Sequence, residues 1–257
     1  MGVGPFYEEG FLASEIGVLN EKPLHAALKS WCARPGDRLE EPVGGYVVDI
    51  ARPGLFLEVQ TGGFSSMRSK VRKLCRDSRL RLVYPVALEK WLLKLPKDGA
   101  RDPVRRKSPK RGRIEEVFAE MVSFPELIAH ANFSVEVLLV RMEEVRSFDG
   151  RRGWRRRGWL VEERRLLEVA ESRLLDGPEA WLSMLPDGMP EEFTTRDIAE
   201  ASGVRRWLAQ KMAYCLRKAG LIGEVGRSRS GKVYRLDRDG MVAGHRSGGE
   251  PGCAKCP

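Results

Sequence analysis

Two carboxylates lie in apolar surroundings in the N-terminal half of the chain. Asp49 follows Tyr46-Val-Val and Glu58 follows Leu55-Phe-Leu, so each acid stands in a run typical of a β-strand covered on both faces. The Arg-Pro-Gly turn at 52–54 joins these runs and brings positions 49 and 58 almost opposite each other on neighbouring strands. Because an uncompensated buried charge is costly, we expect both acids to be paired or to bind a cation.

The oxygen donors at this point favour a hard metal ion. Side chains alternate along a strand, so Glu58 and Gln60 share one face while Val59 points away. Two carboxylates and an amide oxygen at a strand end suit Mg²⁺ or Mn²⁺, with Asp49 and Glu58 as the metal ligands. The alternative is that both acids face solvent from edge strands or pair with nearby arginines.

Two predicted helices flank these strands and bring further polar groups toward them. Glu21 lies three residues before Leu24, on the sheet-facing side of a helix predicted over 20–32. Lys70 lies in a second helix, predicted over 65–76, one residue before the apolar Val71. His25, four residues after Glu21, is interpreted as a structural histidine.

The order of the predicted elements defines the fold class. The helix over 20–32 has Asn20 as N-cap and Leu24, Leu28 and Trp31 on one stripe. Helices and strands alternate after it, which predicts an α/β or α+β core with a mixed sheet flanked by helices rather than a helical bundle. The other predicted elements of this part are strands over 45–51, 55–61, 80–87 and 133–145, a further segment over 90–95 after the third of these, and helices over 65–76, within 114–130 and over 161–175.

This arrangement resembles the PD-(D/E)XK superfamily of restriction-endonuclease-like nucleases, over about a third of the chain. The superfamily pattern is a helix with a Glu, a strand with an Asp, a strand with Glu-x-Lys, then a helix and a strand. The resemblance implies that Glu21 is the helix acid and that Asp49 and Glu58 are the metal ligands. Gln60 stands where the superfamily usually has Lys, although some restriction endonucleases carry Glu-x-Gln. In other branches the Lys has moved to the following helix, where Lys70 is the candidate.

The resemblance implies a metal-dependent DNA endonuclease that hydrolyses phosphodiester bonds with Mg²⁺ or Mn²⁺. Lys70, or Gln60 through a hydrogen bond, would orient the attacking water. Restriction-like nucleases often dimerise to cut both strands, so a homodimer is a further expected partner, without an interface signature in the sequence. The missing Lys at position 60 leaves an alternative open: a catalytically inactive, nuclease-like DNA-binding protein or transcriptional regulator. The runs Glu21–Trp31 and Leu57–Phe64 are also similar to an uncharacterised bacterial family.

The C-terminal part contains a second pattern. Residues 193–204 predict a short helix capped by Thr194 or Thr195, and a second helix over 205–219 ends at Gly220. A hairpin formed by 221–225 and 232–236 follows. This order resembles a winged-helix domain, which implies DNA contact by the second helix and the wing. The candidate DNA-binding residues are Arg206, Gln210 and Lys211 on the helix, and Arg227, Arg229 and Lys232 on the wing.

Composition agrees with a nucleic-acid partner. The chain of 257 residues has 45 Lys and Arg against 36 Asp and Glu, a net charge of +9, which favours polyanions. No stretch approaches the roughly 20 apolar residues of a membrane span, and no secretory signal or disulfide framework is visible, so a cytoplasmic protein without membrane contact is expected. We predict a nuclease-like domain over 1–148, a basic linker and helix over 149–189, a winged-helix domain over 190–238 and a flexible tail over 239–257.

Overall fold

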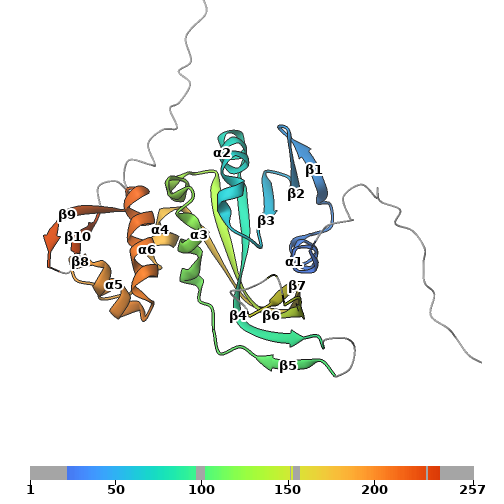
Figure 1. Cartoon of the computed structure of the whole chain (residues 1–257). Coiled ribbons are helices and arrows are strands. Elements are labelled where there is room, and N and C mark those ends of the chain that lie inside the picture. The colour runs from blue at the N-terminus through green and yellow to red at the C-terminus, as the bar shows by residue number, and fades with distance from the viewer. Residues whose placement is uncertain (1–21, 97–101, 151, 153–156, 230, 238–257) are drawn as a thin grey trace, which may run out of the picture.

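A mixed seven-stranded sheet forms the centre of the computed structural model, which describes residues 22–96, 102–150, 152, 157–229 and 231–237 (Figure 1). Its first three strands form an antiparallel meander, β4 and β6 continue parallel to β3, and β7 returns antiparallel to β6. β5 pairs with the far half of β4. The strands are β1 (Arg38–Val43), β2 (Tyr46–Arg52), β3 (Leu55–Val59), β4 (Leu80–Lys94), β5 (Val104–Lys107), β6 (Phe133–Phe148) and β7 (Trp159–Asp176).

Helices cover both faces of this sheet. α1 (Pro23–Cys32) buries Leu24, Leu28 and Cys32 in one apolar cluster, and α2 (Arg68–Asp77) contributes to a separate cluster. Trp31, which was predicted on the buried stripe of the first helix, is 47% exposed, and Cys32 takes the inward position instead. Four short helical segments belong to the cluster of α2: η2 (Phe64–Met67), η3 (Ile114–Val117), α3 (Phe118–Met121) and η4 (Pro125–Ala129).

The prediction of a helix over 161–175 is wrong, because these residues belong to the long edge strand β7. Glu, Arg and Leu favour helices, but pairing with β6 along almost its whole length outweighs this local preference. Three register shifts interrupt the β6–β7 ladder, so strict two-residue alternation is lost from the sequence. The large sheet therefore continues to Asp176, well beyond the boundary predicted at residue 148, and residues 159–176 belong to the sheet rather than to a linker.

The C-terminal unit contains the predicted pair of helices and the predicted hairpin. Thr194 caps α5 (Thr195–Ser202) in a capping box with Asp197, and Gly203, at φ 64°, ends that helix. α6 (Arg206–Lys218) and the hairpin of β9 (Ile222–Ser228) and β10 (Gly231–Leu236) follow. The short strand β8 (Glu192–Thr194) pairs with β10, which gives a three-stranded antiparallel sheet in the order β8–β10–β9.

α6 joins the C-terminal unit to the rest of the molecule. It contacts η3, α3 and η4, and α4 (Gly177–Leu182) lies between the end of β7 and this unit (Figure 1). One apolar cluster runs from β2 and α2 through α3 into α5 and α6. Within the described part of the chain, no helix is long and apolar enough to cross a membrane. The tail 239–257 lies outside the described residues.

Candidate functional site

Asp49 and Glu58 lie beside each other where β2 and β3 separate. The last residues paired across these strands before this point are Ile50 and Leu57. Beyond them, the amide of Asp49 donates to Glu58 Oε1 at 3.3 Å, and the amide of Val59 donates to Asp49 Oδ2 at 2.7 Å. Each carboxylate thus accepts a backbone hydrogen bond from the opposite strand, which holds the two acids together.

A bend in β2 explains why Asp49 leaves the regular ladder. On the β1 side, Leu39 pairs with Ile50 and Glu41 with Val48, while Glu40 between them has a left-handed backbone with φ 52°. Val48 belongs to the apolar cluster of α2, whereas Ile50 belongs to that of α1. Two residues that should share a face therefore point to opposite faces, and Asp49 lies at the bend between them.

The two flanking helices each supply one nitrogen to this pair. Lys70 of α2 forms an ion pair with Glu58, and its Nζ also donates to the carbonyl of Val47 at 2.5 Å. His25 of α1 lies with its Nε2 3.3 Å from Asp49 Oδ2. From the sequence alone, His25 is interpreted as a structural residue. Its position on the sheet-facing side of the first helix is the sequence feature that indicates a contact with Asp49.

The electrostatics of the two acids differ. Glu58 is 3% exposed, and burial together with the charge of Asp49 raises its pKa to about 7. Burial also opposes ionisation of Asp49, but hydrogen bonds from His25 and the Val59 amide and the charges of His25 and Lys70 hold its pKa below the ordinary value. Asp49 therefore carries a negative charge at neutral pH, whereas Glu58, with a pKa of about 7, is only partly ionised.

The other predicted catalytic residues are placed differently. The Gln60 amide Nε2 donates to the carbonyl of Gly63 at 2.8 Å, so its side chain is engaged by its own loop. Glu21 lies outside the described residues. The described residues contain no group of three or more His, Cys, Asp or Glu that could hold a metal ion. A cation at Asp49 and Glu58 would take its remaining ligands from water or from a substrate phosphate, which is how Mg²⁺ is commonly bound.

A groove between α6 and β10 brings three of the six candidate DNA-binding residues together. It has a volume of about 340 Å³, and Arg206, Gln210 and Lys232 line it together with Tyr214 and Arg217. Lys232 also forms an ion pair with Glu224 at 2.6 Å. The groove therefore contains cations and hydrogen-bonding groups from both the helix and the hairpin.

The remaining three candidates lie elsewhere. Lys211 lies at the junction with α3, where its Nζ donates to the carbonyl of Ala119 at 3.2 Å. One residue along a helix turns the side chain by about 100° from Gln210, which explains the difference. Arg227 and Arg229 are exposed on the hairpin, with Arg227 3.8 Å from Glu224.

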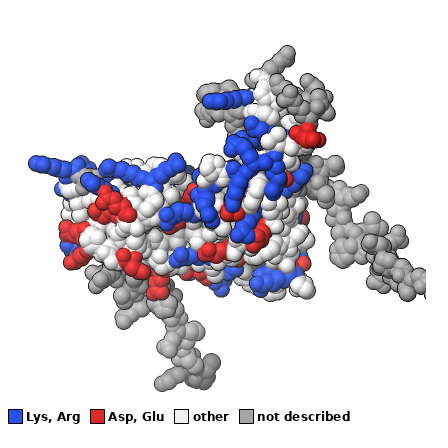
Figure 2. All heavy atoms as spheres, turned by 90° about the horizontal axis from the view of Figure 1, so that it is seen from below, with Lys and Arg blue, Asp and Glu red and all other residues white. Residues whose placement is uncertain are grey.

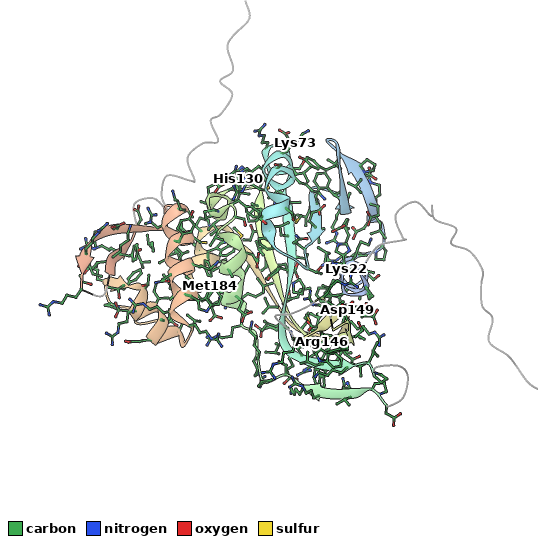
Figure 3. The ribbon with its side chains drawn as sticks, viewed as in Figure 1. Lys22, Lys73, His130, Arg146, Asp149 and Met184 are labelled. Carbon is green, nitrogen blue, oxygen red and sulfur yellow. The ribbon has the colours of Figure 1, made fainter. Side chains whose placement is uncertain are left out.

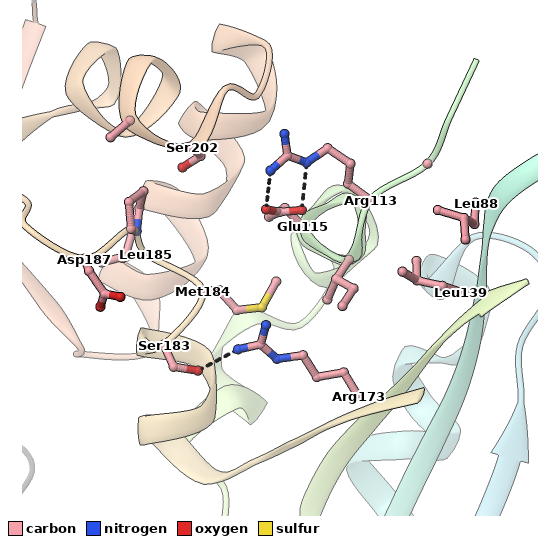
Figure 4. Close-up of a pocket in the computed structure, with 14 residues that line it drawn as sticks. Leu88, Arg113, Glu115, Leu139, Arg173, Ser183, Met184, Leu185, Asp187 and Ser202 are labelled. Carbon is pink, nitrogen blue, oxygen red and sulfur yellow. Dashed lines mark hydrogen bonds and ion pairs between the residues drawn. The ribbon is translucent and has the colours of Figure 1, made fainter. Parts of the chain in front are cut away.

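A second cavity lies between the C-terminal unit and the large sheet, with a volume of about 500 Å³ (Figure 4). Arg113 forms two hydrogen bonds with Glu115 there, at 3.2 and 2.9 Å, and Arg173 donates to the hydroxyl of Ser183 at 3.0 Å. Acidic and basic residues are equal in number in its lining, and both arginines form hydrogen bonds with other side chains of the cavity.

These observations define an α+β protein with a mixed sheet, flanked by helices, that holds an acidic pair where β2 and β3 separate. Residues 22–176 match the family described as domain of unknown function DUF8091, and the chain belongs to this family. The match ends with the last residue of β7, so the family domain comprises the large sheet and its helices. The chain is also 28% identical to an uncharacterized protein of Treponema pallidum (strain Nichols), over 88% of this chain and 89% of that protein. No solved structure matches the chain.

Proposed function

We propose that this protein is a nuclease that cleaves DNA with Mg²⁺ or Mn²⁺ held by Asp49 and Glu58. The observation on which this rests is the pair itself: buried Glu58 and half-buried Asp49 on adjacent strands, with Glu58 accepting from the Asp49 amide and Asp49 from the Val59 amide. Lys70 forms an ion pair with Glu58. The raised pKa of Glu58 supports a cation here, because burial and the charge of Asp49 oppose its ionisation more than the ion pair with Lys70 favours it. A bound divalent ion would lower the pKa of a water and neutralise charge on the scissile phosphate.

The order of elements supports the same proposal. α1, three antiparallel strands, α2 and then β4 follow one another, with Asp49 on the second strand and Glu58 on the third. This is the order that the resemblance to the PD-(D/E)XK nucleases implied. In that scheme Lys70 takes the position of the missing Lys at residue 60, and it would exchange its bond to Val47 for one to the attacking water. His25 would fix the orientation of Asp49.

The C-terminal unit is proposed to act as a winged-helix DNA-binding module. Its two helices, its three-stranded sheet and the groove between α6 and β10 support this assignment. Arg206 and Gln210 would contact DNA from the helix, and Lys232, Arg227 and Arg229 from the hairpin. Replacing Arg206 and Lys232 by Gln should weaken DNA binding, whereas Arg196→Gln, on the exposed side of α5, should not.

A second candidate is a DNA-binding protein without nuclease activity. Two contacts favour it: Gln60 is engaged by Gly63, and Lys70 already satisfies Glu58 as an internal ion pair. In this case the acidic pair would stabilise the fold, and the wing and α6 would carry the function.

One experiment separates the two candidates. Plasmid and linear DNA are incubated with the protein in Mg²⁺, Mn²⁺ or EDTA, beside the variants Asp49→Asn and Glu58→Gln. We expect cleavage with either ion, none in EDTA and none by the variants, with DNA affinity in EDTA and Mn²⁺ binding by calorimetry measured in parallel. Glu136→Gln, which removes a carboxylate paired with Arg81 elsewhere in the sheet, is the matched control. DNA binding without cleavage by the wild type would favour the second candidate, and cleavage by Asp49→Asn would contradict the site.

A further inference from the structure

The large sheet extends beyond its helical covering as a narrow arm rich in cations. We call it the basic arm: residues 88–94 of β4, β5 with the following residues 108–111, residues 141–148 of β6 and residues 159–165 of β7. Its strands lie in the order β5–β4–β6–β7. Figure 1 shows β5 and the end of β4 projecting away from α2, and Figure 3 shows Arg146 of the arm on the opposite side of the molecule from Lys73 of α2.

Three glutamates of the arm are surrounded by more cations than they can neutralise. Glu144, 2% exposed, contacts three cations, Glu89 also contacts three, and Glu143 contacts two. Two of these eight cations reach a further carboxylate, Glu163 or Glu168, so eight cations share five carboxylates. The cations are Lys90, Arg146 and Arg164 around Glu144, Arg105 and Arg165 around Glu143, and Lys107, Arg111 and Arg141 around Glu89.

The excess of positive charge is exposed and held in place. All of β5 is exposed, and Arg106 on its outer side adds a further cation. Arg105 and Lys107 both lie 5.2 Å from the ring of Trp91, and Lys94 lies 4.3 Å from that of Trp159. Such cation–π contacts restrict the side chains before a ligand arrives, which lowers the entropic cost of binding. Figure 2, which views the molecule from the side of the arm, shows Lys and Arg gathered there.

We infer that the basic arm binds the phosphate backbone of duplex DNA. Arginine forks match phosphate oxygens, and the cations exceed the acids that could satisfy them. A protein partner would normally need apolar anchors, but Trp91 is covered by two cations and Val104 is the exposed apolar residue of β5. This inference rests on the proposed function, and it adds a contact surface outside the winged-helix unit.

One DNA molecule is long enough to contact both the acidic pair and the basic arm. Along β4, Leu82 pairs with Glu58 and Leu92 pairs with Arg106. Ten residues of strand extend over roughly 33 Å, which is about one turn of duplex. DNA held at the acidic pair could therefore reach the arm one helical turn away.

The test is the salt dependence of DNA binding. Fluorescence anisotropy with a labelled duplex of about 30 base pairs, in EDTA, is measured between about 50 and 200 mM salt. The triple variant Arg106→Gln, Lys107→Gln and Arg111→Gln should bind more weakly and lose about 2 to 3 from the slope of log K against log salt. The variant leaves Arg141 3.3 Å from Glu89, and circular dichroism verifies its fold. Arg34→Gln, Arg38→Gln and Arg79→Gln, a triple at the other end of the sheet, removes the same charge and should change the slope by less than about 1.

Each other outcome overturns the inference. An unchanged slope in the arm variant would exclude arm contacts, and an equal loss in both triples would show only a response to net charge. If the arm variant keeps full DNA affinity but loses binding to poly-glutamate, the arm binds an acidic protein instead. If the wild type does not bind DNA at all, the proposed function is contradicted as well. If the wild type cleaves DNA but the arm variant keeps the wild-type salt slope, only the DNA contact of the basic arm is contradicted.

Discussion

Glu58 is buried and Asp49 beside it is half-buried, and the pKa values of the two carboxyls shift in opposite directions for a physical reason. Asp49 accepts bonds from His25 and a backbone amide, while Glu58 has Lys70 and lies beside the charge of Asp49. A second carboxylate next to an ionised one holds its proton more tightly. The same imbalance that raises the pKa of Glu58 also makes the pair suited to a divalent ion, so its pH dependence and its metal dependence should be linked.

The pH dependence of stability tests this imbalance directly. The pKa of Glu58 rises from 4.5 to about 7 on folding, so its contribution to stability is full below pH 4.5 and is lost as the pH rises through 7. That shift corresponds to roughly 3 kcal/mol at most. In EDTA, we expect Glu58→Gln to gain stability relative to the wild type across this range, measured by urea unfolding at several pH values. Mn²⁺ should restore the wild type at pH 8 and leave the variant unchanged; a pH-independent difference would contradict the buried charge.

Lys70 provides a complementary prediction. Lys70→Gln leaves Glu58 without its cation, and at pH 8 we expect a loss of roughly 3 kcal/mol, as for other broken buried pairs. Adding Glu58→Gln to Lys70→Gln should recover most of this loss, because no charge then remains unpaired. Urea unfolding of both single variants and the double variant forms the double-mutant cycle. Additive effects would mean that the two side chains do not interact.

Sequence alone predicts part of this site. Asp49, Glu58 and Lys70 follow from strand and helix patterns, and the structure brings all three together. His25 was not predicted as a partner of Asp49, because the contact depends on how closely α1 approaches the bend in β2. The contact of Lys211 with α3 was not predicted either, because a pattern of polar residues on a helix does not reveal which of them meets a neighbouring element.

Elements that begin and end at capping or turn residues were predicted well, whereas long strands that depend on pairing with other strands were not. α5, α6 and the β9–β10 hairpin begin and end close to the predicted positions, because Thr194, Gly203 and Gly220 mark their ends. β7 was predicted as a helix because its Glu, Arg and Leu favour helices, and its register shifts against β6 remove the alternation typical of a strand. β4 was predicted too short, since its far half is stabilised by β5 and β6 rather than by its own sequence.

Gly112 fixes the segment that leads from the basic arm to α3. Its amide donates to the carbonyl of Ala87 at 2.8 Å, and a Cβ at this position would lie 2.6 Å from that oxygen and 2.7 Å from Val86 Cγ1. We expect Gly112→Ala to lower the free energy of unfolding by roughly 1–3 kcal/mol, because the backbone of β4 cannot move aside. Thermal unfolding measures the effect. Gly223→Ala, where a Cβ meets nothing within 4 Å, should stay close to the wild type, and equal effects would exclude the clash as the cause.

At the scale of the whole molecule, the family domain and the C-terminal unit share one apolar cluster. Met212 and Cys215 of α6 belong to it together with Phe118 of α3, and Cys215 Sγ lies 3.8 Å from the Phe118 carbonyl. Trp181 of α4 packs edge-on against Phe118 with ring centres 5.2 Å apart. Separate domains joined by a linker would have two closed cores. Here the interior is continuous, so we expect the acidic pair and the wing to be held in one fixed relative orientation.

Three buried cysteines report on unfolding from different elements: Cys75 in α2 and Cys215 in α6 lie in the shared cluster, and Cys32 in α1 lies in the separate cluster on the other face of the sheet. Burial raises the pKa of each thiol to about 12, so these three cysteines should react slowly with thiol reagents in the folded protein. We expect all three to become reactive over the same range of urea concentration, as mass spectrometry of labelled peptides would show. Met212→Ala should shift the three transitions together, by roughly 2–5 kcal/mol, because it opens a cavity in the shared cluster. If Cys215 reacts at lower urea than Cys32 and Cys75, the C-terminal unit unfolds by itself and the fixed orientation is lost.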